Sequence, residues 1–423
     1  MAHRVSNKSL VVAALSTVVE WYDFTLYLYF ATVLSRVFFG GGEASLATTL
    51  GGFAVAYLMR PVGAVVFGHI GDRRGRRPML LLSMLVMSVA MLATALLPTH
   101  AQIGAAAGWL LFGLRCVMGF SVGGEYTGVI AYLLEGSRPE RRGLIASLAA
   151  AASEVGALLA VAVAALTVSL MSEAELQSWG WRIPFFVGAA LAGAVWFARS
   201  TMEESPDFER LRDAGTLELN PLAHAVSRQR TGLARAFAIS ALGSITYYVG
   251  ITYVPAFLTS IGSMSEADSL WLSTVAAIAV ILVTPLVGLL SDRFGRKPAL
   301  VVLAMLSAAL PITLFSLMAG ASANNALLGA VLLALVAGGV SAVGAIATGE
   351  QFTEESRASG LGLGYTLATV IFGGLTPYVA QRLVERTGAP EMPGIMIAMV
   401  AIAVLPVFVL MRETAPRRAP PTT

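Results

Sequence analysis

Residues 68–78 read GHIGDRRGRRP, and residues 288–298 read GLLSDRFGRKP. The two stretches match at the glycines, the Asp-Arg pair and the closing basic residues and proline, and every matched position is 220 residues from its partner. Each stretch follows directly on a long apolar run. A repeat of this kind is the sequence mark of a membrane protein built from two similar helical bundles.

The composition excludes water as the main solvent of this chain. Hydrophobic residues make up 57% of the 423 residues, charged residues only 13%, and the mean hydropathy is +0.76. Soluble domains average about 25% charged residues. A soluble enzyme, a disordered chain and a disulfide scaffold are therefore excluded, and the single cysteine, Cys116, has no partner for an intrachain disulfide.

Twelve apolar runs are long enough to cross a bilayer, which takes about 20 residues per helix. Because backbone groups must be satisfied within lipid, these runs are expected to be helices. The predicted fold is an all-α polytopic membrane protein with two six-helix bundles, residues 1–201 and 233–423, joined by a cytoplasmic loop at 202–232. The expected spans are 10–38, 47–69, 79–98, 105–135, 143–171, 182–201, 233–260, 268–291, 299–320, 326–352, 358–385 and 393–411.

Basic residues fix the expected orientation. If the N-terminus is cytoplasmic, 22 of the 28 Lys and Arg residues fall in cytoplasmic segments, including Arg4, Arg417 and Arg418. Cytoplasmic loops of membrane proteins carry such an excess. Both termini are therefore expected in the cytoplasm, with the chain surrounded by lipid.

The repeated motif resembles the loop signature of the major facilitator superfamily, and the run from Arg115 to Gly124 (RCVMGFSVGG) resembles the R-x-x-x-G-x-x-x-G motif of the same superfamily. The resemblance implies that the loops act as a conformational latch and that Arg115 takes part in proton coupling. The expected latch residues are Gly68, Asp72, Arg73, Gly75, Arg76, Gly288, Asp292, Arg293, Gly295 and Arg296.

Further stretches resemble one family of that group, the metabolite:proton symporters: EWYDF at 20–24, RPVG at 60–63, GEYTG at 124–128 and WGWRIPFF at 179–186. Members of this family carry citrate, α-ketoglutarate, shikimate, or proline and betaine. The resemblance implies a secondary transporter that needs no cofactor, uses the proton as coupling ion, and works by alternating access. It also implies function as a monomer.

Charged residues inside the apolar runs are the candidates for the transport mechanism, because burying a charge in a membrane is costly. Nearly all of them lie in the first half of the chain. At 100° per residue, Glu20, Asp23 and Tyr27 share one stripe of a helix, and Arg115 and Tyr126 share another, with Glu125 on its flank. The expected proton-coupling residues are Asp23, Glu20, Arg115, Glu125 and Glu154. The expected substrate-binding residues are Arg115, Arg60, Tyr27, Tyr126, Tyr247, Tyr248 and Tyr253.

The substrate stays open between two chemistries. Arginine binds carboxylates in a bidentate fashion, which favours uptake of a di- or tricarboxylate such as citrate. Aromatic faces suit a quaternary ammonium, which keeps proline or glycine betaine as an alternative, and an efflux antiporter is a further rival. No catalytic, metal-binding or nucleic-acid-binding pattern is found in the sequence, so an enzyme is not expected.

Overall fold

The computed structural model describes residues 5–41, 48–49, 52, 55–262, 264–320 and 322–416. The described residues are helices joined by short connections, without a β-strand. The expected span 47–69 lies partly outside these residues, as do Arg4, Arg417 and Arg418. Within the described part, ten helical stretches are long and apolar enough to cross a membrane, or eleven if one bent pair counts as a single span. The chain is therefore an all-α polytopic membrane protein, as predicted.

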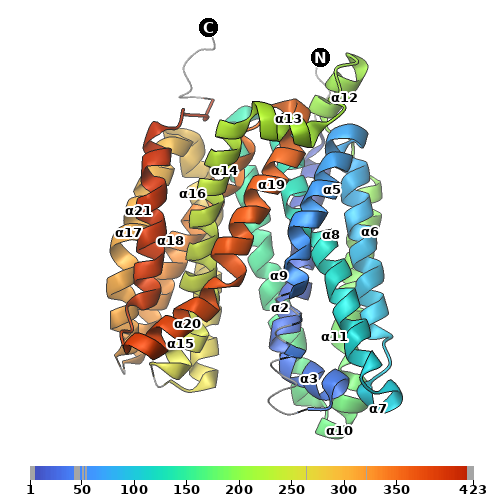
Figure 1. The fold of residues 1–423 in the computed structure, drawn as a ribbon, viewed down its shortest axis with the longest axis vertical. Coiled ribbons are helices and arrows are strands. Elements are labelled where there is room, and N and C mark those ends of the chain that lie inside the picture. The colour runs from blue at the N-terminus through green and yellow to red at the C-terminus, as the bar shows by residue number, and fades with distance from the viewer. Residues whose placement is uncertain are drawn as a thin grey trace. The chain divides into compact units, whose positions relative to one another are not determined.

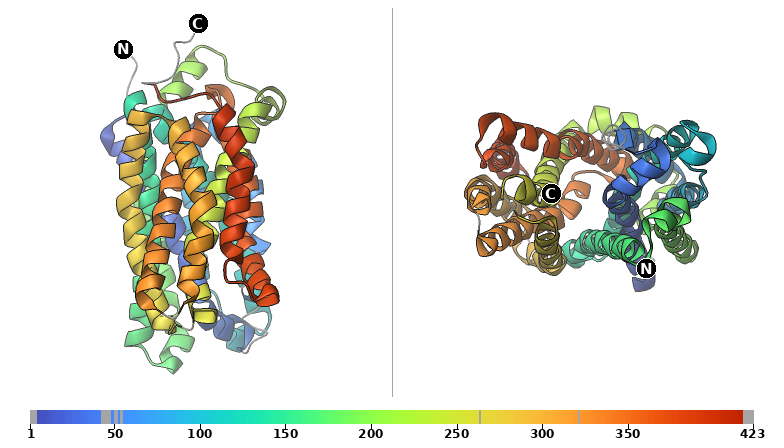
Figure 2. Two further views of the ribbon diagram at one scale, coloured as in Figure 1. Left: turned by 90° about the vertical axis from the view of Figure 1, so that its left-hand side faces the viewer. Right: turned by 90° about the horizontal axis from the view of Figure 1, so that it is seen from below.

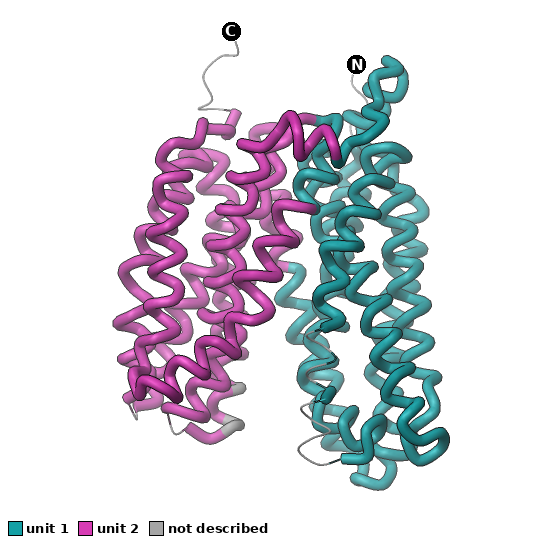
Figure 3. The backbone as a smooth tube through the Cα atoms, in the orientation of Figure 1, with its two compact units in different colours: residues 1–136, 152–222, 354–362 teal, residues 137–151, 223–353, 363–423 magenta. Residues whose placement is uncertain are grey.

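The chain divides into two compact units, drawn in teal and magenta in Figure 3. Unit 1 comprises residues 1–136, 152–222 and 354–362, and unit 2 comprises residues 137–151, 223–353 and 363–423. Each unit thus takes one short segment from the other half of the sequence. The bundle boundaries expected from the sequence stay a prediction.

Unit 1 contains the helices that carry most of the buried charges (Figure 1). The first span is broken at Ser16 into two helices, and α9 begins in unit 2 and continues through unit 1. The helices are α1 (Asn7–Leu15), α2 (Thr17–Tyr29), α3 (Ala31–Phe39), α5 (Met59–Arg74), α6 (Arg76–Ala95), α7 (His100–Ile103), α8 (Ala106–Gly136), α9 (Arg142–Leu170), α10 (Glu173–Glu175), α11 (Arg182–Ser200) and α12 (Pro206–Asp213).

Unit 2 is also built from long, apolar helices (Figure 2). Two of its spans contain a single π-helical turn, at Tyr248–Thr252 between α14 and α15 and at Val370–Gly374 between α19 and α20. The remaining helices are α13 (Pro221–Arg228), which starts in unit 1, α14 (Arg230–Tyr247), α15 (Val254–Ser260), α16 (Glu266–Phe294), α17 (Arg296–Ala319), α18 (Ala323–Gly349), α19 (Arg357–Thr369), which starts in unit 1, α20 (Thr376–Thr387) and α21 (Met392–Leu410).

Glycines let α5 and α8 cross in direct backbone contact. A Cβ on Gly63 would lie 1.8 Å from the carbonyl oxygen of Phe120, and one on Gly123 would lie 2.1 Å from the carbonyl oxygen of Arg60. Small residues at helix crossings in membranes permit this approach. The crossing places α8 against the start of α5, where Arg60 lies.

We expect Gly63→Ala to lower the thermal unfolding midpoint of the purified protein, because a backbone carbonyl cannot move aside as a side chain can. Overpacking of this kind typically costs about 1–3 kcal/mol. The control is Gly113→Ala on α8, where a Cβ meets no atom within 4 Å, so the midpoint should hold or rise slightly. Equal losses in the two variants would contradict the close crossing.

Candidate functional site

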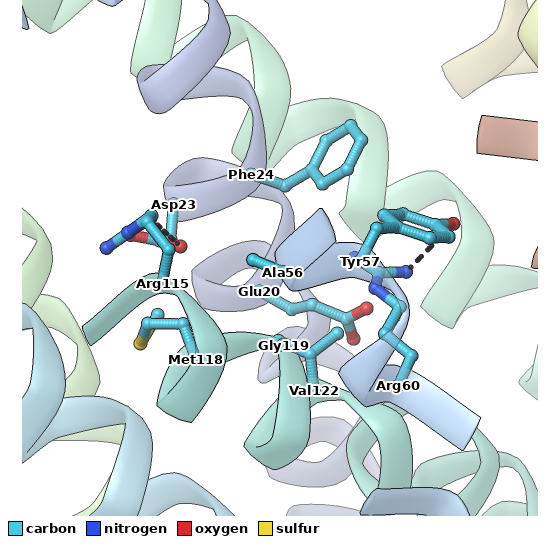
Figure 4. Close-up of a pocket in the computed structure, with 10 residues that line it drawn as sticks. All are labelled: Glu20, Asp23, Phe24, Ala56, Tyr57, Arg60, Arg115, Met118, Gly119 and Val122. Atoms are coloured by element: carbon cyan, nitrogen blue, oxygen red, sulfur yellow. Dashed lines mark hydrogen bonds and ion pairs between the residues drawn. The ribbon is translucent and has the colours of Figure 1, made fainter. Parts of the chain in front are cut away.

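The charged residues of the first span meet α5 and α8 at one pocket within unit 1 (Figure 4). Four predicted site residues, Glu20, Asp23, Arg60 and Arg115, line it together. The pocket leaves a cavity of about 30 Å³, which is room for a water molecule. The other lining residues are Phe24, Ala56, Tyr57, Met118, Gly119 and Val122.

Asp23 and Arg115 form a buried ion pair on one side of the pocket. Nη1 of Arg115 donates to both carboxylate oxygens of Asp23, at 2.9 and 3.1 Å, and both residues are only 4% exposed. The guanidinium lies over the ring of Tyr27 at 5.1 Å from its centroid. Nε and Nη2 of Arg115 have no hydrogen-bond partner within the described part of the chain. Arg115 therefore keeps donors available beside the bond to Asp23.

Arg60 lies on the other side of the pocket, between two aromatic rings. Its guanidinium is 4.3 Å from the ring centroid of Tyr57 and 5.2 Å from that of Phe24. Nη1 also donates to the Tyr57 hydroxyl over 3.3 Å. Cation–π contacts such as these partly replace the hydration that a buried guanidinium loses.

Glu20 is the carboxylate of the pocket that lacks an ion-pair contact among the described residues. It is 2% exposed, and its Oε2 has no hydrogen-bond partner there. Figure 4 shows its carboxylate on the side of the pocket where Arg60 lies, and the two charges are within electrostatic range. The pocket thus holds two carboxylates and two guanidinium groups, of which one pair is bonded directly.

Glu125 does not line the pocket but pairs with Arg199 of α11, which sequence reasoning missed. Nη1 of Arg199 donates to Oε2 of Glu125 over 3.0 Å, Nη2 donates to Oε1, and both residues are fully buried. Arg199 is one of the 22 basic residues that fall in cytoplasmic segments in the expected orientation. The only signal that could have found it is its place within the apolar run 182–201.

The remaining predicted residues lie outside the pocket lining. Tyr126 is half-buried and within electrostatic range of Glu20, and Glu154 is buried on α9. In unit 2 the rings of Tyr247 and Tyr248 pack edge to face at 5.6 Å, and the hydroxyl of Tyr253 donates to Gln381 over 2.6 Å. The transport roles expected for these residues stay predictions.

The motif at 68–78 forms an ion-pair network at one end of unit 1. Asp72 accepts hydrogen bonds from the backbone N–H groups of Ala358 and Ser359, at 3.1 and 2.9 Å, and from Nη1 of Arg76 at 2.6 Å. Arg76 also donates to Glu135, from Nη2 over 2.8 Å. The segment that Asp72 holds comes from the second half of the sequence.

The motif at 288–298 forms a matching network in unit 2. Asp292 accepts hydrogen bonds from the backbone N–H groups of Gly143 and Leu144, at 2.8 and 2.9 Å. Nη2 of Arg296 lies 2.7 Å from Asp292, and its Nε lies 3.4 Å from Glu350. Asp292, in the second half of the sequence, thus holds a segment from the first half.

A carboxylate caps the helix that follows each motif. Gly75 and Gly295 have φ of 109° and 110°, and a Cβ there would lie 2.2 Å from Glu204 and 2.4 Å from Glu413, respectively. Glu204 accepts from the backbone N–H of Arg76 over 2.9 Å. The glycine is therefore needed both for its backbone conformation and for the space that the capping carboxylate fills.

The networks include residues that the sequence analysis did not select, and two expected members lie apart from them. Arg73 and Arg293 are exposed, and Arg293 lies over the ring of Phe294. Gly68 and Gly288 lie in tight contacts with Ser359 and Ser147. The added members are Glu135, Glu204, Arg357, Glu350 and Glu413, with Arg357 joining Glu135 and Asp207 at 3.0 Å each.

No group of three or more His, Cys, Asp or Glu residues able to hold a metal ion occurs among the described residues. The pocket is lined by carboxylates, guanidinium groups and aromatic rings. Such a set can exchange a proton and bind a small charged molecule.

A helical membrane protein with a charged pocket on its first spans has the architecture of a secondary transporter, and comparison with known proteins places it in a family. Residues 9–218 match the family model "Sugar (and other) transporter", and residues 237–423 match "Major Facilitator Superfamily". The glycine betaine/proline/ectoine/pipecolic acid transporter of Dickeya dadantii is 32% identical over 97% of this chain and 84% of that protein. The chain belongs to the major facilitator superfamily.

Two further relatives are named for other substrates. The α-ketoglutarate permease of Escherichia coli is 34% identical over 89% of this chain and 87% of that protein. The citrate-proton symporter of Klebsiella pneumoniae is 31% identical over 90% of this chain and 86% of that protein. These are transporters, which confirms the expectation that the chain is not an enzyme.

A solved structure shows the same fold. The structure of a proton:xylose symporter bound to 6-bromo-6-deoxy-D-glucose matches with a TM-score of 0.79 at 19% identity, over 96% of each chain. The match confirms the predicted superfamily fold.

The cap at Glu204 predicts a pH effect on stability. Burial raises the pKa of Glu204, although backbone N–H groups oppose the shift. The folded state therefore binds this proton more tightly than the unfolded state, so stability falls as the pH rises from the ordinary carboxyl value through the raised one.

In the curve of unfolding midpoint against pH, we expect Glu204→Gln to flatten the fall that begins above the ordinary carboxyl value of about 4.3. The control is Glu140→Gln, which removes an exposed carboxylate and should leave the curve unchanged. An unaltered slope in Glu204→Gln would show that the cap does not carry this proton.

Proposed function

We propose that this protein is a proton-coupled symporter that takes up a small carboxylate-bearing metabolite by alternating access. The observation that carries the proposal is the buried Asp23–Arg115 pair beside Glu20 in one pocket. Here a carboxylate that can take a proton and a cation that can take a substrate anion are bonded to each other.

The pair couples the two events through competition for Arg115. Ionised Asp23 neutralises the guanidinium, and protonation of Asp23 removes that partner. A buried ion left without its partner is costly, by about 3–5 kcal/mol when one side of a pair is removed. A substrate carboxylate restores the balance by binding Arg115, whose Nε and Nη2 have no hydrogen-bond partner in the described chain. Proton and substrate therefore bind together and leave together.

Glu20 and Arg60 serve the same pocket in this proposal. Arg60 provides a second cationic contact for the substrate, held in place by Tyr57 and Phe24. Glu20 is a second proton acceptor, because its buried Oε2 lacks a hydrogen-bond donor in the described residues. Glu125 is bound to Arg199 and acts indirectly, and Glu154 stays a candidate for proton coupling.

The two ion-pair networks act as latches in the same cycle. Asp72 and Asp292 each hold backbone N–H groups of a segment from the other half of the sequence. Release of either segment from the unit that holds it requires these hydrogen bonds to break. Arg76 and Arg296 hold each carboxylate in place while the bonds are made.

The substrate class follows from what the two guanidinium groups bind. Both favour a substrate carboxylate, a group shared by α-ketoglutarate, citrate, proline and glycine betaine. Two cations in one pocket favour a di- or tricarboxylate. The alternative is a zwitterion whose ammonium group lies on aromatic faces. The rings of Phe24 and Tyr57, with centroids 6.1 Å apart, would serve it only after Arg60 leaves them.

The protein acts in this proposal as a monomer in the bacterial inner membrane, with both termini in the cytoplasm. The distribution of basic residues supports that orientation, and the bacterial relatives support the membrane. The proton is the coupling ion, and no cofactor is required.

We expect Asp23→Asn to abolish uptake driven by an inward proton gradient in proteoliposomes, because Arg115 then lacks a partner that changes charge with pH. Exchange of labelled for unlabelled substrate should persist. Asp213→Asn, an exposed site on α12, provides the matched control. Undiminished accumulation of substrate in both Asp23→Asn and Glu20→Gln would contradict the proposed proton coupling.

The substrate class is tested by uptake of radiolabelled α-ketoglutarate, citrate and glycine betaine at matched concentrations. We expect a proton gradient to drive inward accumulation of at least one carboxylate, with the di- and tricarboxylates preferred. Preference for glycine betaine would assign the zwitterion alternative. Outward transport under the same gradient would overturn symport in favour of an efflux antiporter.

A further inference from the structure

A second buried ion pair lies outside the pocket and has no part in the proposed exchange of proton and substrate. Arg199 on α11 and Glu125 on α8 are both fully buried. A buried pair is by itself weak support for stability, because desolvation of two charges offsets much of their attraction. The reason for this pair must therefore lie in what it holds in place.

The pair joins four helical segments of unit 1. The Arg199 fork donates from Nη1 to Glu125 and, over 2.7 Å, to the carbonyl oxygen of Leu80 on α6. Its Nη2 donates to Glu125 and to Oγ of Ser16. Ser83 on α6 completes the set by donating to Glu125 over 2.6 Å. One guanidinium thus contacts α6, α8 and the junction of α1 and α2.

Ser16 is the point where the first membrane span breaks. Its hydroxyl also donates to the carbonyl oxygen of Ala13 over 2.6 Å, and the next residue, Thr17, donates in the same way to Ala14 over 2.9 Å. Such back-bonding by serine and threonine bends helices. The helix that starts after the break, α2, carries Glu20, one turn beyond Ser16, and Asp23.

We propose that Arg199 is a positioning residue that, through Ser16 and Glu125, fixes the direction in which α2 leaves the break. Glu20 and Asp23 reach the pocket only if α2 has this direction, so the pair sets the geometry of both carboxylates without touching the substrate. In its transport consequences this inference rests on the proposed function, whereas its structural consequence does not.

The shape of the guanidinium explains why arginine is required. Two nitrogens of the planar fork must reach a carboxylate, a hydroxyl and a carbonyl at the same time, which a lysine ammonium on one atom cannot do. Arg199→Lys therefore keeps the charge that neutralises Glu125 but loses some of the hydrogen bonds to Glu125, Ser16 and Leu80. Ser16→Ala keeps the ion pair and removes both its link to the break and the bond from the Ser16 hydroxyl to Ala13, whereas Arg199→Lys leaves the bond to Ala13 in place.

The first test is hydrogen–deuterium exchange of the full-length protein in detergent micelles. We expect Ser16→Ala and Arg199→Lys to speed exchange of backbone amides in residues 13–24 by about tenfold, the effect of a local opening that becomes easier by one hydrogen bond or two. Peptides from unit 2 should be unchanged. The matched control is Arg182→Lys at the other end of α11, whose guanidinium donates to the carbonyls of Ser178 and Leu97.

Two results would overturn the proposal. One is exchange that rises evenly over all of unit 1, which a merely structural pair predicts. The other is exchange at 13–24 that stays at the native rate in both variants. Because single substitutions of a buried pair can unfold a protein, the double variant Glu125→Met and Arg199→Met gives a further check, since it removes both charges while filling similar space.

The second test is the pH profile of uptake of α-ketoglutarate and of glycine betaine by the same variants. If Arg199 positions the carboxylates, Ser16→Ala, Arg199→Lys and the double variant shift the profile and weaken the apparent affinity together, and Arg182→Lys does neither. A native profile in a folded double variant would overturn the inference. Absence of uptake of both probes by the native protein would instead count against the proposed function. Hydrogen–deuterium exchange would then still test whether Arg199 positions α2.

Discussion

The need to neutralise every charge that leaves water shapes this protein more than any other constraint. Inside a membrane a single carboxylate or guanidinium is costly, and three buried arginines here are neutralised or solvated in two ways. Arg115 and Arg199 pair with Asp23 and Glu125, and Arg60 lies between aromatic rings. The pairs lie on different helices, so neutralising the charges also fixes how those helices pack.

The two halves of the chain meet the same constraint in the same way at the repeated motif. Each half combines an aspartate that accepts two backbone N–H groups, an arginine one turn later, and a glutamate on a more distant helix. Each also places a glutamate cap in the space that a side chain at Gly75 or Gly295 would fill. That the motif keeps glycine there in both copies follows from this geometry.

The sequence predicted much of the fold and part of the site because both depend on local patterns. Apolar length located the spans, and helical periodicity placed Glu20 and Asp23 on one face of one helix. Pairing across helices was not predictable, because it depends on which helices lie together: Glu125 and Arg199 are 74 residues apart. Glu135, the partner of Arg76, and Glu350, the partner of Arg296, are 215 residues apart, and the capping residues Glu204 and Glu413 are 209 apart. These separations differ from the 220 residues between the two motifs, so comparing the halves at that offset does not align these residues. The contact of Arg60 with Tyr57 spans three residues and was accessible from helical spacing.

The two ion pairs of unit 1 differ in their surroundings. The difference indicates which pair can take part in proton coupling and which supports the structure. Glu125 accepts from two nitrogens of Arg199 and from the hydroxyl of Ser83, so removing its charge would leave several donors unsatisfied at once. Asp23 accepts from one nitrogen of Arg115, in a pocket that also holds Glu20 and Arg60. A carboxylate with a single partner can be neutralised by a proton if another anion replaces it, whereas one bound on all sides cannot. The pocket pair is therefore the one suited to change during transport, and the Arg199 pair is suited to stay fixed while it does.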